Sequence, residues 1–141
     1  FQIAQQEGLC FSFASGTIEG AHPNTARIRL TGISGNQISV QGASVGGGNI
    51  LITQINGMAV SFTGQYNTLL VLHHDQPGVI AAVTNFIASS DLNIGNFRLS
   101  RPRKGGEAVM TIEVDGDVPD SLMESLRGQP HVLNVVLIRA I

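Results

Sequence analysis

Residues 70–97 have the sequence LVLHHDQPGVIAAVTNFIASSDLNIGNF, and this stretch decides the fold of the second half of the chain. The apolar run from Asn67 to His74 is typical of a strand covered on at least one face. Residues 75–78 end that strand, and Pro77 suits the first position of a helix with Gln76 near its N-cap. The expected helix, residues 79–90, carries one apolar stripe formed by Val79, Ile80, Val83, Phe86 and Ile87.

The remaining elements of this half follow in a regular order. We expect a turn at 91–93, a strand at 94–101, a solvated hairpin tip at 101–107, a strand at 108–115, a helix at 121–128 capped by Asp120 and ended by Gly128, and a last strand at 132–140. Strand, helix, strand, strand, helix, strand predicts a ferredoxin-like βαββαβ sandwich with both helices on one face of an antiparallel sheet. The other face is rich in apolar residues, so we expect dimerisation or packing on the preceding domain to cover it.

The sequence pattern of the first half is typical of an antiparallel meander. Residues 26–32 alternate apolar and polar, a turn at 34–36 follows, and three more strands are expected at 37–43, 49–55 and 58–64. Asn56 and Gly57 form a type I′ hairpin signal between the last two strands. The fold class is therefore α+β, with a β-rich domain at residues 1–65 and a second domain at residues 66–141.

The chain starts with FQIAQQEG, which suggests the end of a helix with Gly8 as its C-terminal cap. No N-cap precedes this helix, so we expect the chain to be a piece of something longer with an incomplete first domain. We also expect the missing part to cover the apolar face of the meander.

Composition excludes several classes of function. The chain has 141 residues and a net charge of −2, which lacks the basic excess of a nucleic-acid-binding protein. No apolar run approaches the roughly 18 residues of a membrane span, so we expect a soluble, cytoplasmic protein without nucleic-acid or membrane partners. Cys10 is the single cysteine, expected to be a small buried residue, and it cannot form an internal disulfide or hold an iron–sulfur cluster alone.

The His73–His74 pair raises the question of a metal site. Adjacent strand residues point to opposite faces, so the two imidazoles cannot converge on one metal ion, and we predict no metal site. We place the chemistry at the start of the following helix, whose free N–H groups attract a carboxylate. Asp75 could meet the amino group of the same ligand, so an amino acid would suit both ends.

Two segments of the first half have open interpretations. Residues of the HPNT segment form either a polar pocket wall for an anionic or amino-acid ligand or a local turn, and the turn is favoured. The glycine-rich segment 42–48 forms either an anion-binding nest or a bulge. The residues assigned to a possible second pocket or subunit contact are His22, Asn24, Thr25, Ser44, Gly46, Gly47 and Gly48.

Residues 67–141 resemble an ACT domain, the amino-acid-sensing module of many metabolic enzymes, on the basis of the quoted stretch and AVMTIEVDGDVP at 108–119. The resemblance implies a homodimer whose effector, often serine in proteins with the Asn-Ile-Gly signature, lies between two domains. It would contact one segment of one copy and another segment of its neighbour. These segments are Asp75, Gln76, Pro77, Gly78 and Val79, and Asn93, Ile94, Gly95 and Asn96.

With AHPNTARIRLTG and QGASVGGGNILITQINGMAVSF in the first half, the chain resembles the beta chain of iron–sulfur L-serine dehydratases. The resemblance implies conversion of L-serine to pyruvate and ammonia, with a 4Fe-4S cluster held by a partner alpha chain and acting as Lewis acid. The serine-rich SSHT motif of such beta chains is absent. We therefore expect this fragment to bind no cofactor, to contribute no catalytic residue and to be inactive alone.

Two alternatives compete with this interpretation. The C-terminal regulatory region of D-3-phosphoglycerate dehydrogenases joins a similar β-rich domain, including a QING hairpin, to a similar ACT domain. The third possibility is a dimerisation module that binds nothing. The open helix start after Pro77–Gly78 favours a ligand over this last interpretation.

Overall fold

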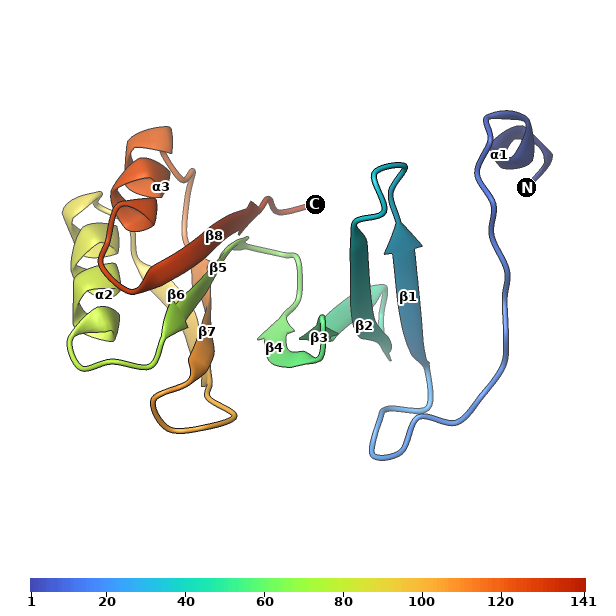
Figure 1. The fold of residues 1–141 in the computed structure, drawn as a ribbon, viewed down its shortest axis with the longest axis horizontal. Coiled ribbons are helices and arrows are strands. Elements are labelled where there is room, and N and C mark those ends of the chain that lie inside the picture. Colours follow the sequence, from blue (N-terminus) through green and yellow to red (C-terminus); the bar gives the residue numbers. More distant parts are fainter.

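The computed structural model describes residues 1–141 as two four-stranded antiparallel sheets that follow one another along the chain (Figure 1). The first part contains α1 (Gln2–Gln6), β1 (Thr25–Thr31), β2 (Gln37–Gly46), β3 (Asn49–Ile55) and β4 (Met58–Phe62). The second contains β5 (Asn67–His74), α2 (Val79–Ser89), β6 (Ile94–Ser100), β7 (Glu107–Val114), α3 (Asp120–Arg127) and β8 (Val132–Ile138).

The first sheet is a meander in the order β1-β2-β3-β4, as the alternating pattern predicts. Asn56 and Gly57 both have positive φ, 49° and 82°, and Ile55 pairs with Met58 across them. A two-residue turn of this kind matches the twist of antiparallel strands, which confirms the predicted hairpin.

The second sheet has the order β6-β7-β5-β8, with α2 and α3 both on one face (Figure 1). This is the predicted βαββαβ sandwich. Its core lies between the sheet and the two helices and contains thirteen buried apolar residues, including Leu69, Val83 and Ile112, each 0% exposed. The α+β fold class is confirmed.

Strand β7 is buried on both faces because β4 packs on the side of the second sheet away from the helices. Val109 of β7 forms a small core cluster with Val60 and Phe62 of β4. Packing on the preceding domain, one of the two expected ways of covering this face, is therefore present. The chain between β4 and β5 forms the joint of the two sheets.

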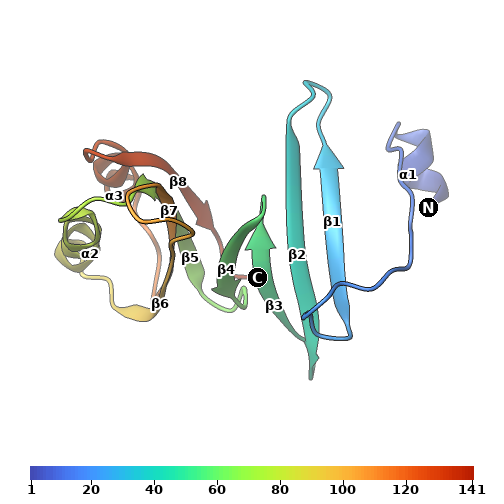
Figure 2. The same ribbon diagram turned by 60° about the horizontal axis from the view of Figure 1, so that its bottom comes forward.

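Strand β1 keeps its predicted alternation but does not bury its apolar side, since Ile28 and Leu30 are 53% and 54% exposed. Helix α1 lies apart from the first sheet (Figure 2) and buries no residue. The C-cap of that helix is Glu7 and not Gly8 as predicted; Gly8, at φ 82°, follows it directly. The prediction that Cys10 is buried is wrong, because the surrounding segment packs on neither sheet and leaves the thiol exposed.

None of the three helices has the length and apolar character that crossing a membrane requires.

Candidate effector-binding site

Helix α2 begins at Val79, as the expected range 79–90 has it, but its N-cap is Gly78 and not Gln76. Gly78 has φ 89°, a left-handed conformation that a residue with a Cβ adopts only at a cost. The predicted helical position of Pro77 is wrong because the chain leaves β5 and reverses direction through Gly78 before the helix starts.

The start of α2 keeps backbone donors available for a ligand. The Val79 N–H bonds the Gln76 carbonyl at 3.4 Å, and no side chain caps the helix. The N–H groups of Ile80 and Ala81 have no hydrogen-bond partner. Unpaired N–H groups at a helix start carry a partial positive charge, so this end of α2 can accept a carboxylate.

Asp75 is already engaged by the β6–β7 hairpin. Its Oδ2 accepts a hydrogen bond from the Gly105 N–H at 2.8 Å and lies 3.3 Å from Nε of Arg101. Its own N–H bonds the Gly106 carbonyl at 2.8 Å. The hairpin tip is therefore not simply solvated, as the sequence suggested, and Arg101 is a charged neighbour of the site that sequence reasoning missed.

His73 and His74 face opposite sides of β5, as predicted, with His73 1% exposed and His74 exposed. The Nδ1 of His73 lies 2.8 Å from the carbonyl oxygen of His74. A carbonyl can only accept, so Nδ1 carries a proton, and in the neutral imidazole Nε2 is then an acceptor. This Nε2 is buried without a partner two residues before Asp75, which makes His73 a further candidate for ligand contact.

Asn93 and Asn96 lie at the start of β6, each held by a carboxylate. Nδ2 of Asn93 donates to Oδ2 of Asp115 at 2.8 Å, and Nδ2 of Asn96 donates to Oε2 of Glu113 at 2.9 Å. Both amide oxygens are left without a partner. A Cβ at Gly95 would lie 3.6 Å from Oδ1 of Asp115, so a small side chain is tolerated there.

The two predicted segments lie at opposite ends of the second sheet within one copy. Ile94 pairs with Val114, which also pairs with Asn67 at the start of β5. Asp75 follows the other end of β5. The eight residues of β5 are joined by seven steps of about 3.4 Å, so the two ends lie about 24 Å apart. One small amino acid cannot contact both segments of the same copy.

The two uncertain segments of the first half lie beside each other. The Ser44 N–H bonds the Asn24 carbonyl at 3.0 Å, and the Asn24 N–H bonds Nδ1 of His22 at 3.2 Å. Thr25 pairs with Ala43 next to them. These contacts are those of a local turn at the start of β1, the favoured interpretation.

The glycine run forms the turn between β2 and β3. Gly46, Gly47 and Gly48 have φ values of 96°, 63° and 80°, and Gly46 pairs with Asn49. The register also shifts between Ser44 and Gly46, which is the bulge that the sequence left open. A second pocket or subunit contact at these residues stays a prediction.

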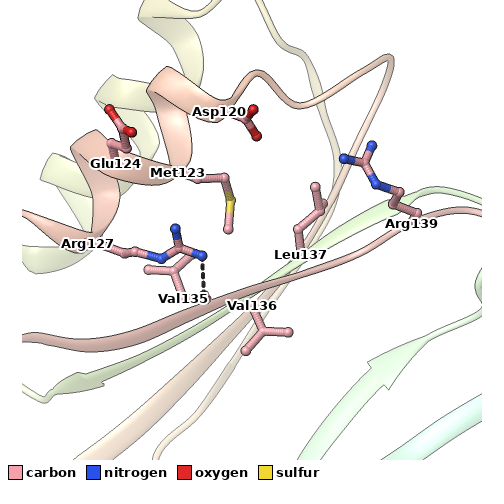
Figure 3. A pocket seen from close by; sticks show the side chains of 8 residues that line it. All are labelled: Asp120, Met123, Glu124, Arg127, Val135, Val136, Leu137 and Arg139. Atoms are coloured by element: carbon pink, nitrogen blue, oxygen red, sulfur yellow. Dashed lines mark hydrogen bonds between the residues drawn. The ribbon is translucent and has the colours of Figure 1, made fainter.

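A hollow of the surface lies elsewhere, between α3 and the edge strand β8 (Figure 3). This open groove of about 520 Å³ is lined by Asp120, Met123, Glu124, Arg127, Val135, Val136, Leu137 and Arg139. Asp120 is the first residue of α3 and makes no capping bond, so its prediction as the cap is wrong; Pro119 occupies the cap, and its carbonyl accepts from the Leu122 N–H. None of the predicted site residues lines the groove.

The chain offers no donor set for a metal ion or an iron–sulfur cluster. No three His, Cys, Asp or Glu side chains converge, and Cys10 is a lone exposed thiol. The residues present do not fit a 4Fe-4S cluster, which is held by several cysteine thiolates.

Comparison with known proteins places the second half in a defined class. Residues 67–131 match the ACT domain family, in agreement with the βαββαβ topology. This segment is an ACT domain.

Nearly the whole chain is similar to beta chains of L-serine dehydratase, which confirms the resemblance inferred from the sequence. It is 36% identical to the probable L-serine dehydratase beta chain of Bacillus subtilis (strain 168), over 97% of this chain and 62% of that protein. It is 32% identical to the L-serine dehydratase beta chain of Peptoniphilus asaccharolyticus, over 91% of this chain and 58% of that protein. The chain thus spans about six tenths of these relatives.

A D-3-phosphoglycerate dehydrogenase of Bacillus subtilis (strain 168) is 27% identical over 96% of this chain but only 26% of its own length. The similarity to this second group is lower, although it also covers both halves.

Proposed function

We propose that this chain is the regulatory and assembly part of an L-serine dehydratase. The observation that carries the proposal is the similarity to two dehydratase beta chains across both sheets, at higher identity than to the dehydrogenase. In this proposal the complete cytoplasmic enzyme converts L-serine to pyruvate and ammonia. The fragment by itself is inactive because it supplies no catalytic group.

The proposed role of the ACT domain is to sense a small amino acid, L-serine in the first instance. The ligand carboxylate would bind the unpaired N–H groups of Ile80 and Ala81 at the start of α2. Asp75 and the unpartnered amide oxygen of Asn93 are the acceptors offered to its ammonium group. The bare Nε2 of His73 could accept a hydrogen bond from the serine hydroxyl.

We propose that two copies of the chain complete each site. The support is the separation of the two segments at opposite ends of β5, which a ligand can bridge only if one segment comes from a neighbour. Both edge strands of the ACT sheet, β6 and β8, have a free edge that a second copy can pair with. A two-fold dimer would then hold two equivalent sites.

The proposed partner is a dehydratase alpha chain that carries the 4Fe-4S cluster. The support is the similarity to two proteins that are named as beta chains of L-serine dehydratase. In the complete enzyme the cluster would supply a Lewis acid for the substrate hydroxyl. The present chain would contribute binding and regulation.

Mixing two variants tests the shared site. Asp75→Asn and Asn93→Ala should each weaken L-serine binding in a homodimer, because each damages one half of both sites. After exchange of subunits, about half of the dimers are mixed, and each mixed dimer regains one site with both halves intact. Recovery of tight binding on mixing supports the shared site. If binding does not recover, the two segments do not form one site between two copies.

The regulatory region of a D-3-phosphoglycerate dehydrogenase is the second candidate, because those proteins are also similar across both halves. Co-purification from the native cells separates the two: an iron–sulfur alpha chain favours the dehydratase, and a nucleotide-binding dehydrogenase domain on the same chain favours the alternative. A module that dimerises and binds no ligand is the third candidate.

A further inference from the structure

Glu113 is a carboxylate buried between the two sheets, 6% exposed, on the face of β7 that β4 covers. Its Oε2 accepts a hydrogen bond from Nδ2 of Asn96 at 2.9 Å. Its Oε1 accepts from the N–H of Thr63 at 3.2 Å and from Oγ1 of Thr63 at 3.4 Å. All three donors are neutral, and no cation pairs with this carboxylate.

A buried carboxylate without a cation is costly, since its desolvation is repaid only by hydrogen bonds. Val109, on the same face of β7, packs against the first sheet at no such cost. An apolar residue at position 113 would serve packing equally well. The role of the carboxylate is therefore to accept the hydrogen bonds of Asn96 and Thr63, and not to increase the stability of the fold.

One task of Glu113 is to set the orientation of the Asn96 amide. A carboxylate that receives donors on both oxygens can only accept, so Asn96 must turn its NH2 group towards Glu113. The Asn96 oxygen is then left without a partner at the half of the site contributed by β6. Glu113 thus decides that Asn96 offers an acceptor, suited to an ammonium group, and not a donor.

The other oxygen of the same carboxylate holds the joint between the sheets. Thr63 follows β4 directly, and its Oγ1 also accepts from the N–H of Gln65 at 3.3 Å. The Gln65 side chain in turn donates to Oδ1 of Asn49 at 2.8 Å, beside the turn between β2 and β3. A continuous set of hydrogen bonds thus runs from Asn96 to the first sheet.

We propose that Glu113 is a positioning residue that orients Asn96 for the effector and couples occupancy of the site to the joint at Thr63. This inference rests on the proposed amino-acid sensing. A ligand that draws on the Asn96 amide changes the hydrogen bonding of one carboxylate oxygen. The bond from the other oxygen to the Thr63 N–H then changes with it.

Nuclear magnetic resonance of the amide groups measures both ends of this link on the chain as it stands. In a titration with L-serine, the amide resonances of Ile80 and Ala81 report binding at the start of α2, and that of Thr63 reports the joint. We expect Thr63 to shift with the same dissociation constant as the α2 amides. D-serine at equal concentration serves as the control for nonspecific effects.

Glu113→Gln tests the role of the carboxylate at nearly constant volume. The N–H of Thr63 can only donate, so the glutamine keeps its oxygen towards Thr63 and turns its NH2 group towards Asn96. Asn96 must then turn its amide over and offer a donor to the ligand ammonium. We expect L-serine affinity to fall about tenfold, the effect of about one lost hydrogen bond. The Thr63 resonance should no longer follow the α2 amides. Glu124→Gln makes the same chemical change on the exposed face of α3 and should leave both readouts unchanged.

The possible results distinguish a failure of the coupling through Glu113 from a failure of amino-acid sensing. If the α2 amides shift with L-serine while Thr63 does not, the coupling is overturned and the sensing proposal stands. If no resonance shifts at millimolar L-serine, amino-acid sensing fails and the coupling fails with it. Should Glu113→Gln not fold, Asn96→Ala removes the same bond from an exposed residue and must likewise uncouple Thr63 from the ligand.

Discussion

Replacing Gly78 by alanine should lower the free energy of unfolding of the ACT domain by about 1–2 kcal/mol, the cost of a left-handed conformation for a residue with a Cβ. Gly78 has φ 89°, and a Cβ placed there meets no atom within 4 Å. The cost is therefore in the backbone alone, and no steric clash adds to it. For a domain of this size the melting temperature should fall by at least about 4 °C.

Thermal and urea unfolding followed by circular dichroism measure this change. Gly78→Asn should be less destabilising than Gly78→Ala, because asparagine tolerates left-handed backbone better than alanine. Gly8→Ala is the matched control: Gly8 has φ 82° and an equally open Cβ position, but α1 buries no residue. Strain at Gly8 is relieved by fraying of α1 and should leave the melting temperature unchanged.

A Gly78→Ala variant that melts at the wild-type temperature would contradict this expectation, since the helix would then start without a left-handed residue. The expectation is also refuted if Gly8→Ala is equally destabilising. The Gly78→Ala variant should additionally bind L-serine more weakly, because the alanine shifts the loop that presents the first N–H groups of α2.

Three further substitutions test the core and the site. Ile112→Ala should cost about 2–5 kcal/mol of unfolding free energy in urea titrations, because Ile112 is fully buried; a loss under about 1 kcal/mol contradicts that burial. Asp75→Asn removes the partly exposed pair with Arg101 and should change stability by less than about 1 kcal/mol while weakening L-serine binding. His73→Leu removes an unpartnered buried nitrogen together with its bond to His74. Stability should therefore stay within about 1 kcal/mol, and calorimetry should show weaker binding.

Much of the fold could be predicted because local signals agree with it. The strand at 67–74 and the strand at 49–55 have the bounds that their apolar patterns predict. The Asn56–Gly57 turn also needs no long-range information, since few residue pairs accept positive φ at both positions. The order strand, helix, strand, strand, helix, strand then predicts the βαββαβ sandwich for the second half of the chain.

Helix starts were predicted less well because several residues near each start have suitable chemistry. Pro77 fits a first helical position and Asp120 fits a cap, yet Gly78 and Pro119 occupy the caps. The direction of the chain between strand and helix decides between such neighbours. That direction depends on packing and not on local preference.

The contacts of the candidate site depend on pairs that are distant in sequence. Gly105 bonds Asp75 from 30 positions away, and Thr63 bonds Glu113 from 50 positions away. Glu113 alternates with Ile112 and Val114 of the helix-covered core and so lies on the other face of β7, but only the packing of β4 on that face buries it. The basic hairpin tip could have indicated a partner for Asp75, since opposite charges lie on both segments.

Calorimetric titration of this chain with L-serine, with D-serine and glycine as controls, tests the central claim most directly. The proposed site predicts stereospecific binding of L-serine, because it addresses three substituents of one carbon atom. The helix start binds the carboxylate, Asp75 and the Asn93 oxygen bind the ammonium group, and Nε2 of His73 binds the hydroxyl of the side chain. Absence of binding at millimolar L-serine, with the chain folded and dimeric, would contradict the sensing role and favour a module for assembly alone.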